Sequence, residues 1–235
     1  MKTANIVSPE DWLSDRKSLL EQEKAFTRAR DALSAARRAL PWTRVEKDYV
    51  FTAPDGRKSL ADLFDGRDQL MVYHFMLGPD WKQGCKACSY LADHFDPAVI
   101  HLAHRDVSFV SVSRAPLDQI IPFKERMGWS FPWVSSFESD FNRDFHVSFD
   151  QAEMDAGEIY YNYRQTSFPE AEAPGLSVFA KGDDGAVYHT YSTYGRGLDI
   201  FITAYNFLDH APKGRDEQDL PYGMDWVRHH DRYDD

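Results

Sequence analysis

The chain has 235 residues, a formal net charge of −11 at pH 7 and a hydrophobic share of 43 %. This length and apolar content are enough for one domain with a real core and an appendage. The acidic balance argues against nucleic acid or an anionic membrane as the main partner. The sequence has no apolar run long enough to cross a bilayer and no secretory signal pattern at its start. We therefore expect a cytoplasmic protein without a membrane partner.

The first predicted element is a long helix within residues 1–44. Ser8 is a good N-cap, Pro9 suits the first turn, and two acidic residues follow near the positive end of the helix dipole. Apolar residues then recur with a period near 3.5 as far as Leu40, and Pro41 ends the helix. This helix either packs on its own domain or makes a dimer contact. The sequence leaves both arrangements open, and the second would make the protein a homodimer.

Residues 45–210 are predicted to form a single α/β domain. A hairpin with its turn at Asp55-Gly56 comes first, followed by a helical turn over residues 59–64. A buried strand over 70–77, a helix over 85–104, a second buried strand over 107–113 and a helix over 116–127 come next. Strands that alternate with helices of this length imply βαβ units and a mixed or parallel sheet.

The second half of the domain is patterned less regularly. Residues 148–173 are weakly patterned, and we treat them as an excursion from the core fold. Residues 176–180 and 186–191 flank a Gly/Asp turn and predict a hairpin, and residues 198–210 predict a last helix. The polar residues 211–235 have little periodicity and are expected to pack on the domain as a C-terminal tail.

The chemistry-bearing motif is Cys85-Lys86-Ala87-Cys88, which holds the two cysteines of the chain. It follows a buried strand and a loop and lies at the start of a predicted helix, where free backbone N–H groups lower the pKa of a thiol. Cys88 lies about one turn further on the same face, within reach of a disulfide. Cys85 is then the exposed nucleophile and Cys88 the resolving thiol. Structural disulfides are rare in the cytosol, so redox chemistry is the leading interpretation.

The order of elements resembles the thioredoxin fold: a buried strand, a Cys-x-x-Cys helix, a βα unit, then Ala173-Pro174 before a hairpin and a last helix. We expect a central mixed sheet of four or more strands, flanked by helices on both faces. In that family the corresponding proline is cis and faces the disulfide, and the residue before it pairs with substrate backbone. The resemblance implies that Pro174 is cis and that Ala173 offers its backbone to a substrate.

A closer resemblance covers nearly the whole chain. Segments such as those at 72–76, 78–81, 113–116, 131–136, 175–179, 189–194 and 226–231 look like a bacterial family of thioredoxin-like proteins that is catalogued as a domain of unknown function. The chain is also distantly similar to peroxiredoxins and alkyl hydroperoxide reductases. It departs from their Pro-x-x-x-Thr-x-x-Cys pattern, because Lys82 and Gly78 stand three and seven residues before Cys85. Pro174 and Gly175 occupy their late-strand arginine position, so peroxidase activity is the less favoured function.

Several other residues are candidates for the site. His74 and Asp80 are candidate proton relays near the cysteines, although a core histidine and a solvated loop carboxylate explain them as well. Trp81 precedes the motif, where it either shields the thiolate on the substrate side or simply packs within the loop. Arg114 follows the second buried strand, where α/β sites gather, and is a candidate substrate contact or a simple ion pair. His101 and His104 are helical neighbours, but no histidine has a motif spacing from the cysteines.

These residues predict a thiol–disulfide oxidoreductase that needs no cofactor and whose catalytic residues are Cys85 and Cys88. Its partners are a protein or small-molecule disulfide and a cellular thiol reductant. Two alternatives stay open. The same thiols suit a zinc or copper carrier or sensor, and the scaffold suits a binding module without turnover. We assign no metal ligands.

Overall fold

A computed structural model describes residues 4–233, which divide after Pro41 into two compact units. The first three residues of the predicted N-terminal segment and the last two of the predicted tail lie outside the described residues. The first unit is the helix α1, Pro9–Arg38. Ser8 is its N-cap, and the hydroxyl of Ser8 accepts a hydrogen bond from the backbone N–H of Asp11 at 3.1 Å. No residue of α1 is buried.

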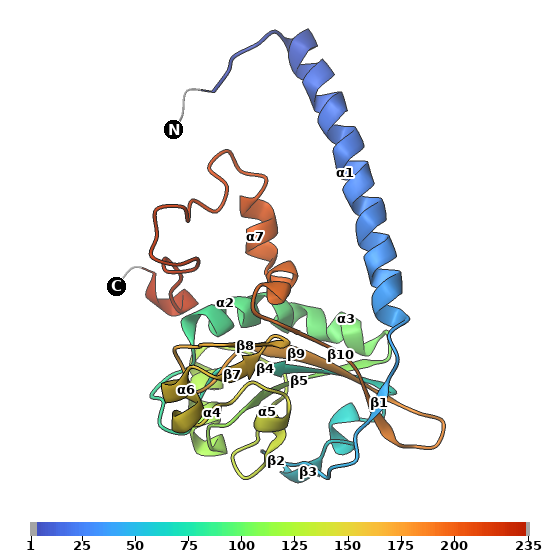
Figure 1. Ribbon diagram of the computed structural model, residues 1–235, viewed down its shortest axis with the longest axis vertical. Helices are drawn as coiled ribbons and strands as arrows, with labels where there is room; N and C mark the ends of the chain where they lie inside the picture. The colour runs from blue at the N-terminus through green and yellow to red at the C-terminus, as the bar shows by residue number, and fades with distance from the viewer. Residues whose placement is uncertain (1–3, 234–235) are drawn as a thin grey trace. The chain divides into compact units, whose positions relative to one another are not determined.

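The second unit is built on an eight-stranded mixed sheet (Figure 1). Its strand order is β1-β10-β9-β4-β5-β6-β2-β3. The bounds are β1 Thr43–Arg44, β2 Val50–Ala53, β3 Gly56–Ser59, β4 Gln69–His74, β5 Val107–Ser113, β6 Trp133–Ser135, β9 Gly175–Lys181 and β10 Val187–Tyr194. The parallel pair β4–β5 is joined through helices, and the hairpin β9–β10 runs antiparallel beside β4. This order is the thioredoxin-like arrangement expected from the sequence.

The helices cover mainly one face of the sheet. A core cluster joins β4 side chains to α2 Lys86–Phe95, α4 Leu117–Arg126 and α7 Thr203–Leu208, with α3 Val99–Ala103 packed beside it. A second cluster on the other face joins the hairpin β2–β3 and β4 to the 3-10 helix η1 Asp62–Phe64 and the short α5 Phe141–Asp144. Phe141 is 0 % exposed there and packs edge-on against Tyr49 and Phe51. Side chains that alternate between faces along β4 therefore contribute to two separate cores.

Two helices predicted as continuous are interrupted. The predicted helix over 85–104 ends at Phe95, and η2 Asp96–Ala98 with Pro97 leads into α3, because proline lacks the N–H that continues a helix. The predicted helix over 198–210 is η3 Gly195–Phe201 followed by α7, with Ile202 in an extended conformation between them. The excursion holds α6 Gln151–Ala156 and a hairpin of β7 Ile159–Tyr161 and β8 Arg164–Thr166.

As far as Tyr233, where the described residues end, the tail is irregular except for η4 His230–Arg232. Its Val227 is fully buried in the main core cluster, and Trp226 packs its ring 5.5 Å from that of Tyr90 on α2. Among residues 4–233 there is no helix with the length and apolar character that a membrane crossing requires.

Candidate functional site

The Cys-x-x-Cys motif is fixed at the N-terminus of α2. Cys85 is the N-cap residue: its carbonyl accepts from the N–H of Ser89 at 2.9 Å, and its own N–H donates to the carbonyl of Met76 at 3.0 Å. Gly84 is needed before it, because a Cβ at this position would lie 2.6 Å from ring atoms of both Phe75 and Phe123. The close packing of this loop fixes Cys85 at the N-terminus of α2, where the backbone N–H groups of Ala87 and Cys88 reach its thiol.

The two thiols have different surroundings. Cys85 is partly exposed, whereas Cys88 is 2 % exposed. A hydrogen bond from the Cys88 side chain, helped by the backbone N–H groups of Cys88 and Ala87, lowers the pKa of Cys85 from 9.0 to about 7 despite its burial. Burial, together with the hydrogen bond to Cys85, raises the pKa of Cys88 well above its usual value. The accessible thiol is therefore the more easily ionised one, as a nucleophile and resolving pair requires.

Tyr73, and not His74, faces the cysteine pair. The Tyr73 hydroxyl hydrogen-bonds the Cys88 side chain, and the ring belongs to the same core cluster as Cys88. His74 points to the opposite face of β4, because neighbouring residues of a strand alternate. There it stacks on Phe141, and its Nε2 lies 2.8 Å from Ser177 Oγ. The proposed relay role of His74 is corrected by this placement, and burial lowers its pKa to about 3, so the ring is neutral.

The cysteine pair lines a recess of about 1200 Å³. Tyr73, Met76, Leu91 and Trp81 line it beside the thiols. Further lining comes from the excursion, from Pro174 just before β9 and from the segment after β10, namely Phe168, Pro169, Glu170, Gly195, Arg196, Leu198, Asp199, Ile202, Tyr205 and Asp209. Side chains of the C-terminal tail between Lys213 and Met224 complete the lining.

The part of the site that the sequence does not reveal is the tail. His229 Nε2 lies 2.9 Å from the carbonyl oxygen of Gly84, and Lys86 Nζ donates to the carbonyl of Asp225 at 3.3 Å. Further along, Arg126 forms a two-pronged ion pair with Asp231, with both N···O distances 2.8 Å. Contacts of this kind leave no periodic pattern in the sequence, and only the polar cluster at 229–231 hints at them.

Within the tail, the carboxylate of Glu217 accepts three hydrogen bonds that hold the segment in place. Its Oε1 accepts from the Tyr205 hydroxyl at 2.8 Å, from the N–H of Met224 at 3.0 Å and from Trp226 Nε1 at 2.7 Å. One carboxylate thus ties the tail to itself and to α7. The lining segment between Lys213 and Met224 is held in place on the body of the domain.

The segment before β9 differs from the expectation drawn from the thioredoxin fold. No peptide bond among residues 4–233 is cis, so the prediction of a cis Pro174 is wrong. Ala173 donates its N–H to the carbonyl of Val147 at 2.8 Å, and Ser148 bridges to Glu172 in antiparallel fashion. This extended pairing continues into β9 through an ordinary trans bond. Ala173 is 2 % exposed and its N–H is engaged within the chain, whereas Pro174 lines the recess.

Arg114 and Asp80 do not line the recess that holds the thiols. Arg114 pairs with the buried carboxylate of Glu172 at 3.3 Å. Asp80 is exposed in the loop. Glu172 also accepts a hydrogen bond from the Ser148 hydroxyl, and burial raises its pKa from 4.5 to about 7. Arg114 is therefore in an ion pair, but with a buried carboxylate that the sequence did not indicate and not with a solvent-exposed one.

The histidines do not gather around the cysteines. In the part of the chain that the structure describes, no three His, Cys, Asp or Glu side chains form a group able to hold a metal ion. His94 Nε2 accepts the N–H of Ala204 at 3.1 Å and so anchors the start of α7 on α2. His101 and His104 are exposed.

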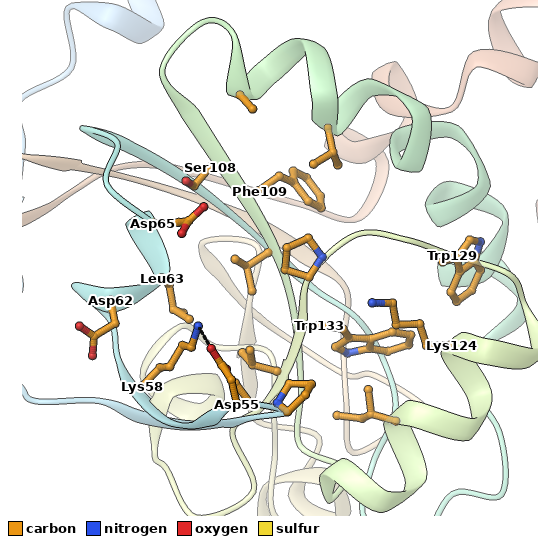
Figure 2. A pocket seen from close by; sticks show the side chains of 18 of the residues that line it. Asp55, Lys58, Asp62, Leu63, Asp65, Ser108, Phe109, Lys124, Trp129 and Trp133 are labelled. Atoms are coloured by element: carbon orange, nitrogen blue, oxygen red, sulfur yellow. Dashed lines mark ion pairs between the residues drawn. The ribbon is translucent and has the colours of Figure 1, made fainter.

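A second recess of about 760 Å³ opens near β2–β3, η1 and the start of β5. Figure 2 shows Asp55, Lys58 and Asp62 on one side of it and Lys124 and Trp133 on the other. Lys58 Nζ pairs with Asp55 at 2.8 Å. The cysteines are not among the residues that line this recess, and it holds no nucleophilic thiol.

Comparisons with solved structures give distant likenesses of the fold. The peroxidoxin BcpB from Mycobacterium tuberculosis is 14 % identical, with a TM-score of 0.48 over 70 % of this chain and 94 % of that one. A cysteine-to-serine mutant of PrxQ from Xylella fastidiosa is 11 % identical, with a TM-score of 0.45 over 71 % of this chain and 94 % of that one. A cysteine-to-serine mutant of peroxiredoxin Q from Xanthomonas campestris is 14 % identical, with a TM-score of 0.43 over 74 % and 99 %.

A search of curated proteins finds no match. The match to a family model is extensive: it spans residues 1–233 and therefore includes the thiol motif, the excursion and the tail. The chain belongs to the family described as bacterial protein of unknown function (DUF899).

Proposed function

We propose that this protein is a thiol–disulfide oxidoreductase that cycles Cys85 and Cys88 between dithiol and disulfide. The observation that carries the proposal is the asymmetry of the pair. Cys85 is partly exposed in the recess with its pKa lowered to about 7, whereas Cys88 is buried behind it with its pKa raised. An accessible thiolate next to a protonated partner is the arrangement that thiol–disulfide exchange needs.

The reaction proceeds in two exchanges. The Cys85 thiolate attacks one sulfur of the substrate disulfide, the substrate S–S bond breaks, and the first thiol leaves after taking up a proton. The Cys88 thiol then loses its proton and attacks Cys85 Sγ, which releases the second thiol and leaves a Cys85–Cys88 disulfide. The Tyr73 hydroxyl supports the developing charge on Cys88 by hydrogen bonding. Two electrons pass to the substrate, and a cellular thiol reductant returns two to the protein.

The recess favours a substrate disulfide with a mainly apolar body. Trp81, Leu91 and Phe168 line it together with other apolar side chains. Charged side chains also line it, including Lys86, Glu170, Arg196 and Lys213, and Arg215 pairs there with Asp209 at 2.8 Å. Peroxide reduction is the weaker alternative. The charge of Arg114 is engaged by Glu172, and Pro174 and Gly175 stand where β9 begins, in place of an arginine.

Substitution of each cysteine tests this function. We expect the purified chain to accelerate the reduction of an unactivated apolar disulfide by a thiol reductant above the rate that the reductant gives alone. Cys85→Ser should abolish turnover, and Cys88→Ser should accumulate a mixed disulfide seen by mass spectrometry. Because the chain has two cysteines, no other thiol complicates the measurement.

The alternatives give different results. Stoichiometric zinc or copper that is lost equally in both variants would indicate a metal carrier. Turnover of hydrogen peroxide that exceeds turnover of the disulfide would indicate a peroxidase. A protein with neither activity, whose Cys85 resists alkylation at pH 8, would contradict the proposal.

A further inference from the structure

The N-terminal unit carries a stripe of large apolar side chains at strict heptad spacing. Its members are Trp12, Leu19, Phe26 and Leu33 on α1 and Leu40 just past the helix end, and each is between 46 % and 70 % exposed. A seven-residue repeat falls short of two full helical turns, so the stripe drifts by about 20° per heptad in a straight helix. Two such helices keep their stripes in contact by winding around each other with a left-handed supercoil. The pattern is that of a helix made to pair with another helix.

The charges of α1 are segregated along its length. Residues 9–23 hold five acidic and two basic side chains, a net charge of −3. Residues 24–38 hold five basic and one acidic side chain, a net charge of +4. In a parallel pair of identical helices like charge would face like charge along both halves. In an antiparallel pair the acidic half of each helix faces the basic half of the other, which is favourable.

The stripe has the symmetry that antiparallel self-pairing needs. Phe26 is its middle member, so reversal of the helix places Phe26 on Phe26, Leu19 on Leu33 and Trp12 on Leu40. Every residue of the stripe then meets another residue of the stripe, as a two-fold interface requires. Ala36, one turn before Leu40, is small and leaves space for the indole of Trp12 on the facing helix.

We propose that the occupant of this stripe is α1 of a second copy of the chain, paired antiparallel about a two-fold axis at Phe26. The protein is then a dimer held by its N-terminal helices. This inference does not depend on the proposed redox function.

Cross-linking of the full-length chain tests the arrangement. In a Cys85→Ser, Cys88→Ser background, Phe26→Cys should form a disulfide-linked dimer under mild oxidation. Trp12→Cys alone should not, because Trp12 and Leu40 are about 42 Å apart along a helix and the two Trp12 positions lie at opposite ends. A mixture of Trp12→Cys and Leu40→Cys chains should cross-link. Self-linking of Trp12→Cys would show a parallel pair and overturn the proposal.

The solution mass gives an independent test. Sedimentation should give twice the 27.1 kDa mass of one chain. Phe26→Glu places two negative charges against each other at the axis and should weaken association by about 100-fold or more. Ser14→Glu adds the same charge on the opposite side of the helix and should leave the dimer intact. A wild-type chain that sediments as a monomer would overturn the proposal. This holds even if Phe26→Glu lowers the thermal stability of that monomer.

Discussion

Replacing Cys88 with alanine is expected to raise the pKa of the Cys85 thiol. The hydrogen bond from the Cys88 side chain is the largest cause of the low Cys85 pKa of about 7, and alanine removes it. The backbone N–H groups of Cys88 and Ala87 remain as lesser causes. The whole lowering, from 9.0 to about 7, corresponds to roughly 3 kcal/mol. Alanine should remove the larger part of it, so the pKa should rise by more than one unit.

The assay is the rate of Cys85 alkylation by iodoacetamide between pH 5 and 10. The wild type must be reduced beforehand. A rise of one unit lowers the thiolate fraction at pH 6 about tenfold, while the more basic thiolate reacts about threefold faster once formed. Rates at a single pH therefore understate the change, and the midpoint of the pH profile is the quantity to compare. The alanine variant should show a higher midpoint and a higher plateau than the wild type.

Cys88→Ser is the matched control. A serine hydroxyl donates a hydrogen bond from the same position, so the midpoint for this variant should stay near that of the wild type. If the alanine and wild-type profiles share one midpoint, the backbone N–H groups of the helix terminus set the pKa and our reasoning about Cys88 is wrong. An equal shift in the serine and alanine variants would also refute it.

Three further outcomes are expected. Tyr73→Phe removes the hydroxyl beside Cys88, so formation of the protein disulfide, measured by mass spectrometry, should slow by about threefold for each unit by which the Cys88 pKa rises, because the tenfold loss of thiolate is partly offset by its higher reactivity; Cys85 alkylation should be unchanged. Phe141→Ala empties a fully buried position and should cost about 3–5 kcal/mol in urea unfolding, whereas Phe137→Ala, at a position 51 % exposed, should cost less than about 0.5 kcal/mol; equal losses would contradict this. Because burial raises the pKa of Glu172 from 4.5 to about 7, its contribution to stability is full below pH 4.5 and is lost as pH rises to 7. The free energy of unfolding of Glu172→Gln, relative to that of the wild type, should therefore rise by up to about 3 kcal/mol between pH 4.5 and pH 8. A difference between the two proteins that stays constant or falls with pH would contradict this prediction.

Local signals predict much of the fold. The Ser8-Pro9 start of α1, the Asp55-Gly56 turn and the buried strand over 107–113 all lie where the sequence places them. These elements depend on capping, turn chemistry and runs of apolar residues, which act over a few neighbouring positions. The motif at a helix N-terminus follows from the same kind of information.

The site is predicted less completely, for two physical reasons. The strand β4 is apolar on both faces, so no alternation tells which of Tyr73 and His74 faces the thiols; only the packing decides. The tail is held by single contacts to distant residues, such as Glu217 to Tyr205, and these leave no periodic signal. The trans bond before Pro174 likewise reflects pairing with the segment at 147–149, which belongs to the weakly patterned excursion.

The contact between His229 and Gly84 joins residues 145 positions apart in the chain. Closing so long a loop costs more entropy than forming the β4–β5 unit, and contacts of this separation tend to form late in folding. Residues between 213 and 224 line the recess beside the thiols, so one wall of the site depends on contacts that close a loop of this length. If this segment docks late, it completes the recess only after the sheet and the start of α2 have formed.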